Sequence, residues 1–281
     1  MFDVELPSRA TVTESAQLIR ACTDLEHEAG PATLDCTKVE HFGPFGVALL
    51  ASSIAMRRLD GRTTELRLPK DPLAIDFACE VGLDRFARGE RTGLGTLEVR
   101  QMHALDAVYS EAVTEMVLRG VPGMNEDNSY SIQLCLNELL QNVFEWAHSP
   151  VGCTVLARWY LKTRSVRLAV VDRGIGIPAA LRKEKVRDLH RASDADVIEA
   201  AVTTPQLTSR ENRVGGLGLK TIRQTVCERG GRLTVISLSA KLTWVGDKLR
   251  KARSVPMKGT AIEIDIRPGS FADSEPTPMV F

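Results

Sequence analysis

Segments typical of strands and of helices alternate along the first ninety or so residues, and this alternation limits the possible folds more than any other feature. Strand-like and helical segments follow one another at 2–6, 11–28, 32–37, 45–59, 64–69 and 71–83. We expect the first helix to begin at Thr11, because Glu14 follows three residues later as in a capping box. We expect Gly61 to end the second helix. Alternation of this kind predicts a small α/β domain.

The pattern changes near residue 88, where charged residues and glycines interrupt the periodicity. We therefore divide the chain into a domain at 1–88, a linker at 89–101, a second domain at 102–268 and a loose tail at 269–281. The second domain begins with two helical segments, followed by a strand pair, a glycine turn that runs into a helix, and closing strands. This order predicts an α+β sandwich with the helices on one face of a mixed sheet.

Composition and charge argue against several classes of protein. Lys+Arg and Asp+Glu both number 36, so the net charge is zero and gives no general argument for binding nucleic acid or membranes. The basic run at 241–253 is expected to be a solvated hairpin. The longest apolar stretch, at 47–56, is too short to cross a bilayer, and the N-terminus lacks the apolar core of a signal peptide. Six scattered cysteines predict reduced thiols, and we expect a cytoplasmic protein.

Glu138 and Asn142 are the first candidate site residues. They lie four positions apart in the helical segment 127–147, so their side chains share one face of a helix. An isolated pair of this kind fits a solvated helix edge. The alternative is a carboxylate base beside an amide oxygen that ligates a hard cation such as Mg²⁺.

A second group of candidates follows the predicted strand 165–172. Asp172 ends this strand and could accept a hydrogen bond from an exocyclic amine, while Gly174 and Gly176 would let the backbone approach a flat ring. An ordinary turn fits the same residues. Further on, a glycine-rich turn at 215–218 precedes a helix, where free N–H groups and the helix dipole favour phosphates.

Two familiar nucleotide-binding motifs do not fit the glycine segments. GIGIPA resembles a dinucleotide fingerprint but has Ala179 in place of the third glycine. GGLGLKT resembles a P-loop, but Leu219 stands before Lys220 where that motif has glycine.

The ordered set of motifs does have a counterpart. ELLQN, DRGIGIP, GGLGL and KGTAIEI, at 138–142, 172–178, 215–219 and 258–264, resemble the N box, the two glycine boxes and the closing Gly-Thr strand of the GHKL ATPases. That superfamily includes gyrase, the Hsp-type chaperone, histidine kinases and the mismatch-repair ATPase. The resemblance covers roughly residues 100–268 and implies a GHKL, or Bergerat-type, sandwich of the anti-sigma-factor and histidine-kinase branch.

The resemblance implies that the chain binds ATP with Mg²⁺, and it assigns roles to the candidates. Asp172 would read the adenine amino group, with Gly174 and Gly176 shaping the turn beneath the base. Asn142 would hold Mg²⁺ against the phosphates, and Glu138 would orient or deprotonate the attacking water.

The remaining roles concern the phosphates and a lid. Backbone contacts to the phosphates fall to Gly216, Leu217, Gly218 and Leu219. Thr260 would touch the adenine side, and 179–214 would form a lid. Arg210 and Arg213 could stabilise transferred charge, or could be solvated charges of the lid.

The front domain resembles another family. LDCTKVEHFGPFGVALLASS, at 34–53, is similar to the strand–turn–helix core of STAS domains, and the likeness covers about residues 1–88. In switch-type members this turn carries a serine that is phosphorylated. Phe45 has no hydroxyl, so the usual switch is missing here.

A second departure concerns kinase activity. Anti-sigma kinases usually have Arg or Lys and then His three and four residues after the N-box asparagine, whereas this chain has Glu145 and Trp146. We therefore expect an ATP-binding regulatory switch that hydrolyses ATP slowly. The alternatives are an anti-sigma-like binding module and a serine kinase acting on a partner protein. A regulatory protein partner is expected, and a homodimer is left open.

Overall fold

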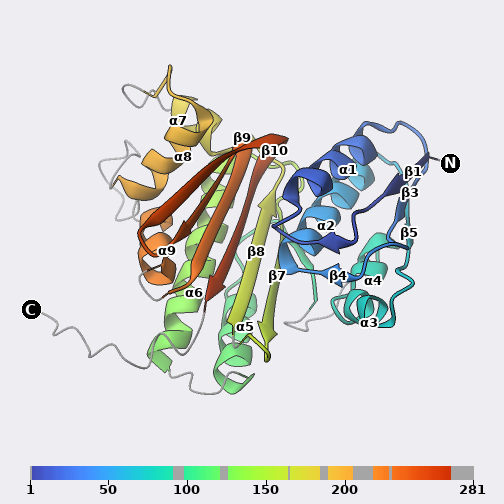
Figure 1. The fold of residues 1–281 in the computed structure, drawn as a ribbon, viewed down its shortest axis with the longest axis horizontal. Coiled ribbons are helices and arrows are strands. Elements are labelled where there is room, and N and C mark those ends of the chain that lie inside the picture. Colours follow the sequence, from blue (N-terminus) through green and yellow to red (C-terminus); the bar gives the residue numbers. More distant parts are fainter. Residues whose placement is uncertain are drawn as a thin grey trace, which may run out of the picture.

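The computed structural model describes residues 2–90, 98–120, 126–163, 165–183, 189–204, 218–227 and 230–266. In these parts the chain forms two layered units, and the N-terminal unit packs against one face of a larger sheet (Figure 1). No helix in the described parts is long and apolar enough to cross a membrane.

The N-terminal unit is built on three parallel strands in the order β1-β3-β5. Its main elements are β1 (Phe2–Glu5), α1 (Ser15–His27), β3 (Ala32–Asp35), α2 (Pro44–Leu59), β5 (Thr64–Arg67), α3 (Pro72–Glu80) and α4 (Leu83–Ala87). Two short strands, β2 (Arg9–Ala10) and β4 (His41–Phe42), form a separate parallel pair. Parallel strands joined by helices are what the alternating sequence predicts, and Gly61 follows α2 in the left-handed conformation, as expected for its end.

The predicted start of α1 is wrong. The helix begins at Ser15, and Glu14, the residue before it, makes no side-chain cap. The Thr11 hydroxyl donates to the Glu14 carboxylate at 2.5 Å and accepts from the N–H of Thr13 at 3.3 Å. Because its hydrogen bonds stay within this turn, the hydroxyl caps no N–H of the helix.

The second unit is built on a five-stranded sheet in the order β6-β7-β8-β10-β9. The strands are β6 (Arg100–Met102), β7 (Cys153–Tyr160), β8 (Ser165–Asp172), β9 (Arg232–Val245) and β10 (Lys248–Ile266). Every pairing among these described strands is antiparallel, so the expectation of a mixed sheet is wrong. Two of these pairings, β7–β8 and β9–β10, join strands consecutive in the chain as hairpins, which run antiparallel. The sheet begins at Arg100, inside the predicted linker.

Helices cover one face of this sheet (Figure 1). They are α5 (Ala107–Gly120), α6 (Glu126–Asn142), the π-helix η1 (Val143–Ala147), α7 (Ile177–Lys183), α8 (Asp194–Thr203) and α9 (Gly218–Cys227). The basic run at 241–253 lies in the β9–β10 hairpin, as predicted, although Trp244 within it is buried in the core between the sheet and the helices.

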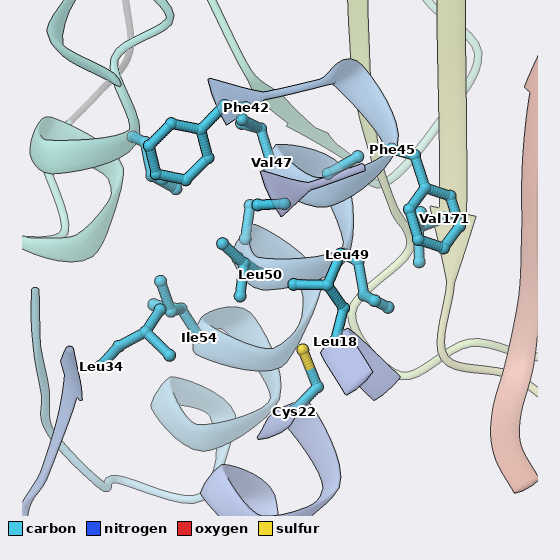
Figure 2. Packing of buried hydrophobic residues seen from close by; sticks show 14 of the residues in the cluster. Leu18, Cys22, Leu34, Phe42, Phe45, Val47, Leu49, Leu50, Ile54 and Val171 are labelled. Carbon is cyan, nitrogen blue, oxygen red and sulfur yellow. The ribbon is translucent and has the colours of Figure 1, made fainter. Parts of the chain in front are cut away.

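The N-terminal unit covers the other face of the sheet, and the two units share one hydrophobic core. Residues of the large sheet that belong to this core are Leu156, Ala169, Val171, Ile236, Met257 and Ala261. Helix α2 lies between the two sheets: Figure 2 shows Phe45 beside Val171 of β8, while Ile54 points towards Leu34 of β3. Every residue from 44 to 55 is buried, which explains why this stretch is apolar all round.

Candidate functional site

A pocket lies on the helix side of the large sheet, where α6 and η1 face the end of β8. Its lining is mostly apolar and comes from α6, η1, β8, α7, α8, α9 and β10. The polar residues among its described lining are few: Asn142, Asp172, Thr204 and Thr260. An apolar pocket with a few convergent polar groups is typical of small-molecule sites.

Asp172 is the last residue of β8 and is only 4 % exposed. Its Oδ1 accepts the N–H of Gly174 at 2.8 Å. Burial raises its pKa to about 6, although hydrogen bonds from the backbone N–H groups of Gly174 and Thr260 oppose that rise. At neutral pH Asp172 is therefore a charged acceptor in an apolar wall, which suits recognition of an amine.

The two glycines after Asp172 have different structural roles. Gly176 lines the pocket with φ of 81°, a left-handed conformation that favours glycine. Gly174 packs against η1, since a Cβ there would lie 1.8 Å from the carbonyl oxygen of Ala147. The N–H of Ile175 donates to that same oxygen at 2.8 Å. The turn is thus attached to the π-helix as well as to its own strand.

Asn142 and Gly218 line the pocket, and Glu138, which is not among the described lining residues, lies against Gly218. Glu138 and Asn142 are one turn apart on α6, and Gly218 begins α9. A Cβ at Gly218 would lie 2.8 Å from Glu138 Oε2 and 3.2 Å from Asn142 Nδ2, so glycine allows α9 to start directly against this pair. Asn142 Nδ2 is buried without a hydrogen-bond partner. A polar ligand entering here would meet an unused donor and the N-terminus of a helix.

Glu138 is partly buried, and its pKa is raised by burial and by the negative charge of Glu145. Glu145 is exposed and accepts from Gln141 Nε2 at 2.9 Å. A carboxylate whose pKa is raised towards neutrality is a better acceptor for a proton from water.

The donor set permits a magnesium ion only together with a ligand. Within the described residues, no three His, Cys, Asp or Glu side chains gather closely enough to hold a metal. Asn142 and Glu138 offer two oxygen ligands, and Mg²⁺ in nucleotide sites commonly takes one or two protein oxygens besides phosphates and water. These residues therefore fit Mg²⁺ that arrives with a phosphate-bearing molecule.

Four of the predicted site residues are not described by the structure. Gly216, Leu217, Arg210 and Arg213 fall outside the described residues. Leu219 follows Gly218 at the start of α9 and lines the pocket, as does Thr260 in β10. The described parts of the expected lid, 179–214, contain the end of α7 and all of α8.

Sequence reasoning missed three features of the pocket. The π-helix η1 brings Trp146 into the wall, and no pattern in the sequence marks this turn as a π-helix. Ser237 accepts the N–H of Ile177 at 3.1 Å and lies 3.0 Å from the Thr260 hydroxyl, a link that becomes visible only when the strands are paired. Helix α8 did carry a signal: Ser193 caps it, with Asp196 three residues later.

A family model described as histidine kinase-, DNA gyrase B-, and HSP90-like ATPase matches residues 127–269. This match covers just over half of the chain and includes every candidate site residue named above. No curated protein matches the chain.

Proposed function

The chain belongs to the histidine kinase-, DNA gyrase B- and HSP90-like ATPase family, and on that basis we propose that it binds ATP with Mg²⁺, hydrolyses it slowly and acts as a nucleotide-controlled regulatory switch. The observation that carries the proposal is the convergence of Asp172, Asn142 and Gly218 on one pocket, with Glu138 against Gly218. These residues come from β8, α6 and α9, and because they line one pocket, a single ligand could contact all three.

Adenine binds at the Asp172 end. The carboxylate accepts from the exocyclic amine, and the apolar lining and the Gly176 backbone contact the ring. Guanine has a carbonyl oxygen where adenine has that amine. Two acceptors would then face each other, and the buried Asp172 carboxylate would lack a hydrogen-bond donor, so we expect guanine to bind more weakly. Thr260, with its hydroxyl beside Ser237, completes this side of the pocket.

The phosphates lie at the opposite end, against the start of α9. Asn142 would be the protein ligand for Mg²⁺, which when bound would neutralise phosphate charge. Glu138 orients a water molecule and accepts its proton as the water oxygen bonds to the γ-phosphorus and ADP leaves with the electrons of the broken P–O bond. The raised pKa of Glu138 favours this transfer.

Binding and turnover of ATP·Mg²⁺ test the proposal, by calorimetric titration and by phosphate release. We expect the wild type to bind and hydrolyse ATP. Glu138→Gln should bind ATP but release phosphate about 10²- to 10³-fold more slowly, because a positioned base contributes about that factor. Asp172→Asn should lose most binding, because the amide is uncharged and its NH₂ group can take the position of the oxygen that accepts from the adenine amine. Glu111→Gln, on the exposed face of α5, is the matched control and should change neither quantity.

Other outcomes separate the alternatives. Binding without phosphate release by the wild type would identify a nucleotide-held binding module. Transfer of the γ-phosphate to a protein would identify a kinase, which Glu145 and Trp146 in the N-box helix argue against. No binding at all would overturn the proposal.

A further inference from the structure

Arg173 connects the candidate nucleotide turn to the N-terminal unit. It follows Asp172 directly, but its side chain lies on the opposite face of the sheet from the pocket. There its Nη2 contacts the carboxylate of Glu26 in α1 and the hydroxyl of Ser53 in α2. The Arg173 residue is only 3 % exposed, so this guanidinium is a buried charge.

The backbone of Arg173 is held as firmly as its side chain. Its N–H donates to Ser149 Oγ at 3.1 Å, just after the π-helix. The next N–H, that of Gly174, donates to the Asp172 carboxylate. On the other side, β10 passes so closely that a Cβ at Gly259 would lie 2.8 Å from the Arg173 Cα. The Arg173 backbone is thus part of the turn that holds the Asp172 carboxylate, and strain placed on the Arg173 side chain acts directly on that turn.

Glu26 is the one negative group that contacts the guanidinium in the described residues. Removing that charge leaves a cation buried between two units, and a buried charge without its partner draws in water or moves towards it. Arg173 Nε has no hydrogen-bond partner of its own, so the Nη2 contacts determine where the guanidinium lies.

Other polar contacts also join the two units. Thr154 Oγ1 donates to the carbonyl oxygen of Ala48 at 2.6 Å and lies 3.5 Å from that of Val171. Lys241 Nζ donates to the carbonyl oxygen of Val12 at 2.6 Å and to Ser15 Oγ at 2.9 Å. Together with the shared hydrophobic core, these contacts keep the units docked when the Arg173 contact is broken. The Arg173 contact is therefore able to affect the pocket without separating the units.

We propose that Arg173 is a positioning residue through which the N-terminal unit sets the nucleotide affinity of the pocket: Glu26 and Ser53 hold its guanidinium, and the guanidinium holds the Asp172 turn in the binding conformation. This inference rests on the proposed ATP binding. Coupling of this kind is reciprocal, so bound nucleotide strengthens the Arg173–Glu26 contact by the same factor.

The test measures the dissociation constants of ADP and ATP·Mg²⁺ for full-length variants that leave the pocket untouched. Glu26→Gln, which removes the charge and keeps the shape, should weaken nucleotide binding about tenfold, within the range usual for coupled sites. Saturating nucleotide should restore the wild-type rate of phosphate release, because Glu138 is unaffected. Asp24→Asn carries the same change of charge on the exposed face of α1 and should stay within about twofold of wild type.

A second control separates positioning from general loosening of the interface. Lys241→Met removes the hydrogen bonds that β9 makes to Val12 and Ser15 of the N-terminal unit, away from the turn. It should lower the melting temperature without changing nucleotide affinity. The inference is overturned if Glu26→Gln binds like wild type, or if Asp24→Asn or Lys241→Met weakens binding as much as Glu26→Gln. Loss of binding by the wild type itself would instead overturn the proposed function, and the inference with it.

Discussion

At the scale of single residues, Asp172 carries its charge where water can scarcely solvate it. Burial raises its pKa from 3.8 to about 6, because desolvation outweighs the stabilising N–H groups of Gly174 and Thr260. For an acid whose folded pKa is raised, the cost to folding is absent below the unfolded pKa of about 3.8 and fully present above about 6. The fold therefore keeps at neutral pH a carboxylate that destabilises it, as is common at binding sites.

The same pKa predicts how nucleoside binding depends on pH. Adenosine, which lacks phosphates that titrate in this range, should bind with constant affinity above pH 7 and more weakly below pH 6. The affinity should fall by up to about tenfold per pH unit, because one proton competes with the exocyclic amine for the carboxylate. Equilibrium titrations of adenosine between pH 5 and 8 would measure this pH dependence of the dissociation constant. Affinity that stays constant over this range would contradict Asp172 as the acceptor.

Candidate residues with a local pattern could be picked out from the sequence, and a residue whose partners are distant in the sequence could not. Asp172 is recognisable because an apolar strand ends there and glycines follow, and Glu138 and Asn142 because helical spacing puts them on one face. Arg173 carries no such signal, since Glu26 and Ser53 lie more than a hundred residues away. Only docking of the two units brings these three together.

At the scale of elements, the start of α9 lies against the last turn of α6, where we propose that the phosphates bind. Periodicity predicted both helices, but it could not predict how close they come, because that distance depends on Gly218 having no side chain. No sequence pattern predicted the π-helix η1, whose last residue, Ala147, accepts the N–H of Ile175 from a distant turn.

Gly218→Ala tests this close approach. The added methyl would lie 2.8 Å from Glu138 Oε2, and the flexible end of Glu138 is the group that gives way. We expect phosphate release to fall at least about tenfold because a displaced base is a poorer one. Adenosine affinity should stay unchanged, because the Asp172 end is not touched.

The control is Gly120→Ala, since a Cβ at Gly120 meets nothing within 4 Å. It should leave both quantities at the wild-type level. If Gly218→Ala hydrolysed ATP at the wild-type rate, Glu138 would not be acting from the position described.

At the scale of the whole molecule, two units share a core that neither completes alone. Helix α2 is buried by the parallel sheet on one side and by β7 and β8 on the other. Its N-terminus is also capped across the interface, where the N–H of Phe45 donates to Glu263 Oε2 at 3.2 Å. The alternation in the first ninety residues predicted an α/β unit, but nothing local in the sequence indicated what would cover its helices.

The shared core predicts that both units unfold together. The three tryptophans, at 146, 159 and 244, all report on the second unit, whereas Cys22 and Cys36 are buried in the first. Urea should change the tryptophan fluorescence and expose these two thiols to labelling at one common midpoint. Phe45→Ala should lower the free energy of unfolding by about 3–5 kcal/mol and move both midpoints equally.

Two outcomes would contradict a single cooperative core. The thiols could become reactive at a lower urea concentration than the fluorescence change, or Phe45→Ala could shift only one of the two probes.

The covered rear face of the large sheet has a consequence for protein engineering. Leu156, Ala169, Val171, Ile236 and Ala261 form an apolar surface that water would reach if the ATPase unit were excised and fused elsewhere. Exposed apolar surface of this kind promotes aggregation. A transplanted ATPase unit would also lose the contacts of Arg173 with Glu26 and Ser53, next to the proposed adenine-binding turn. This nucleotide-binding unit is therefore not a portable module, and a chimera or biosensor built from it has to carry α1 and α2 along.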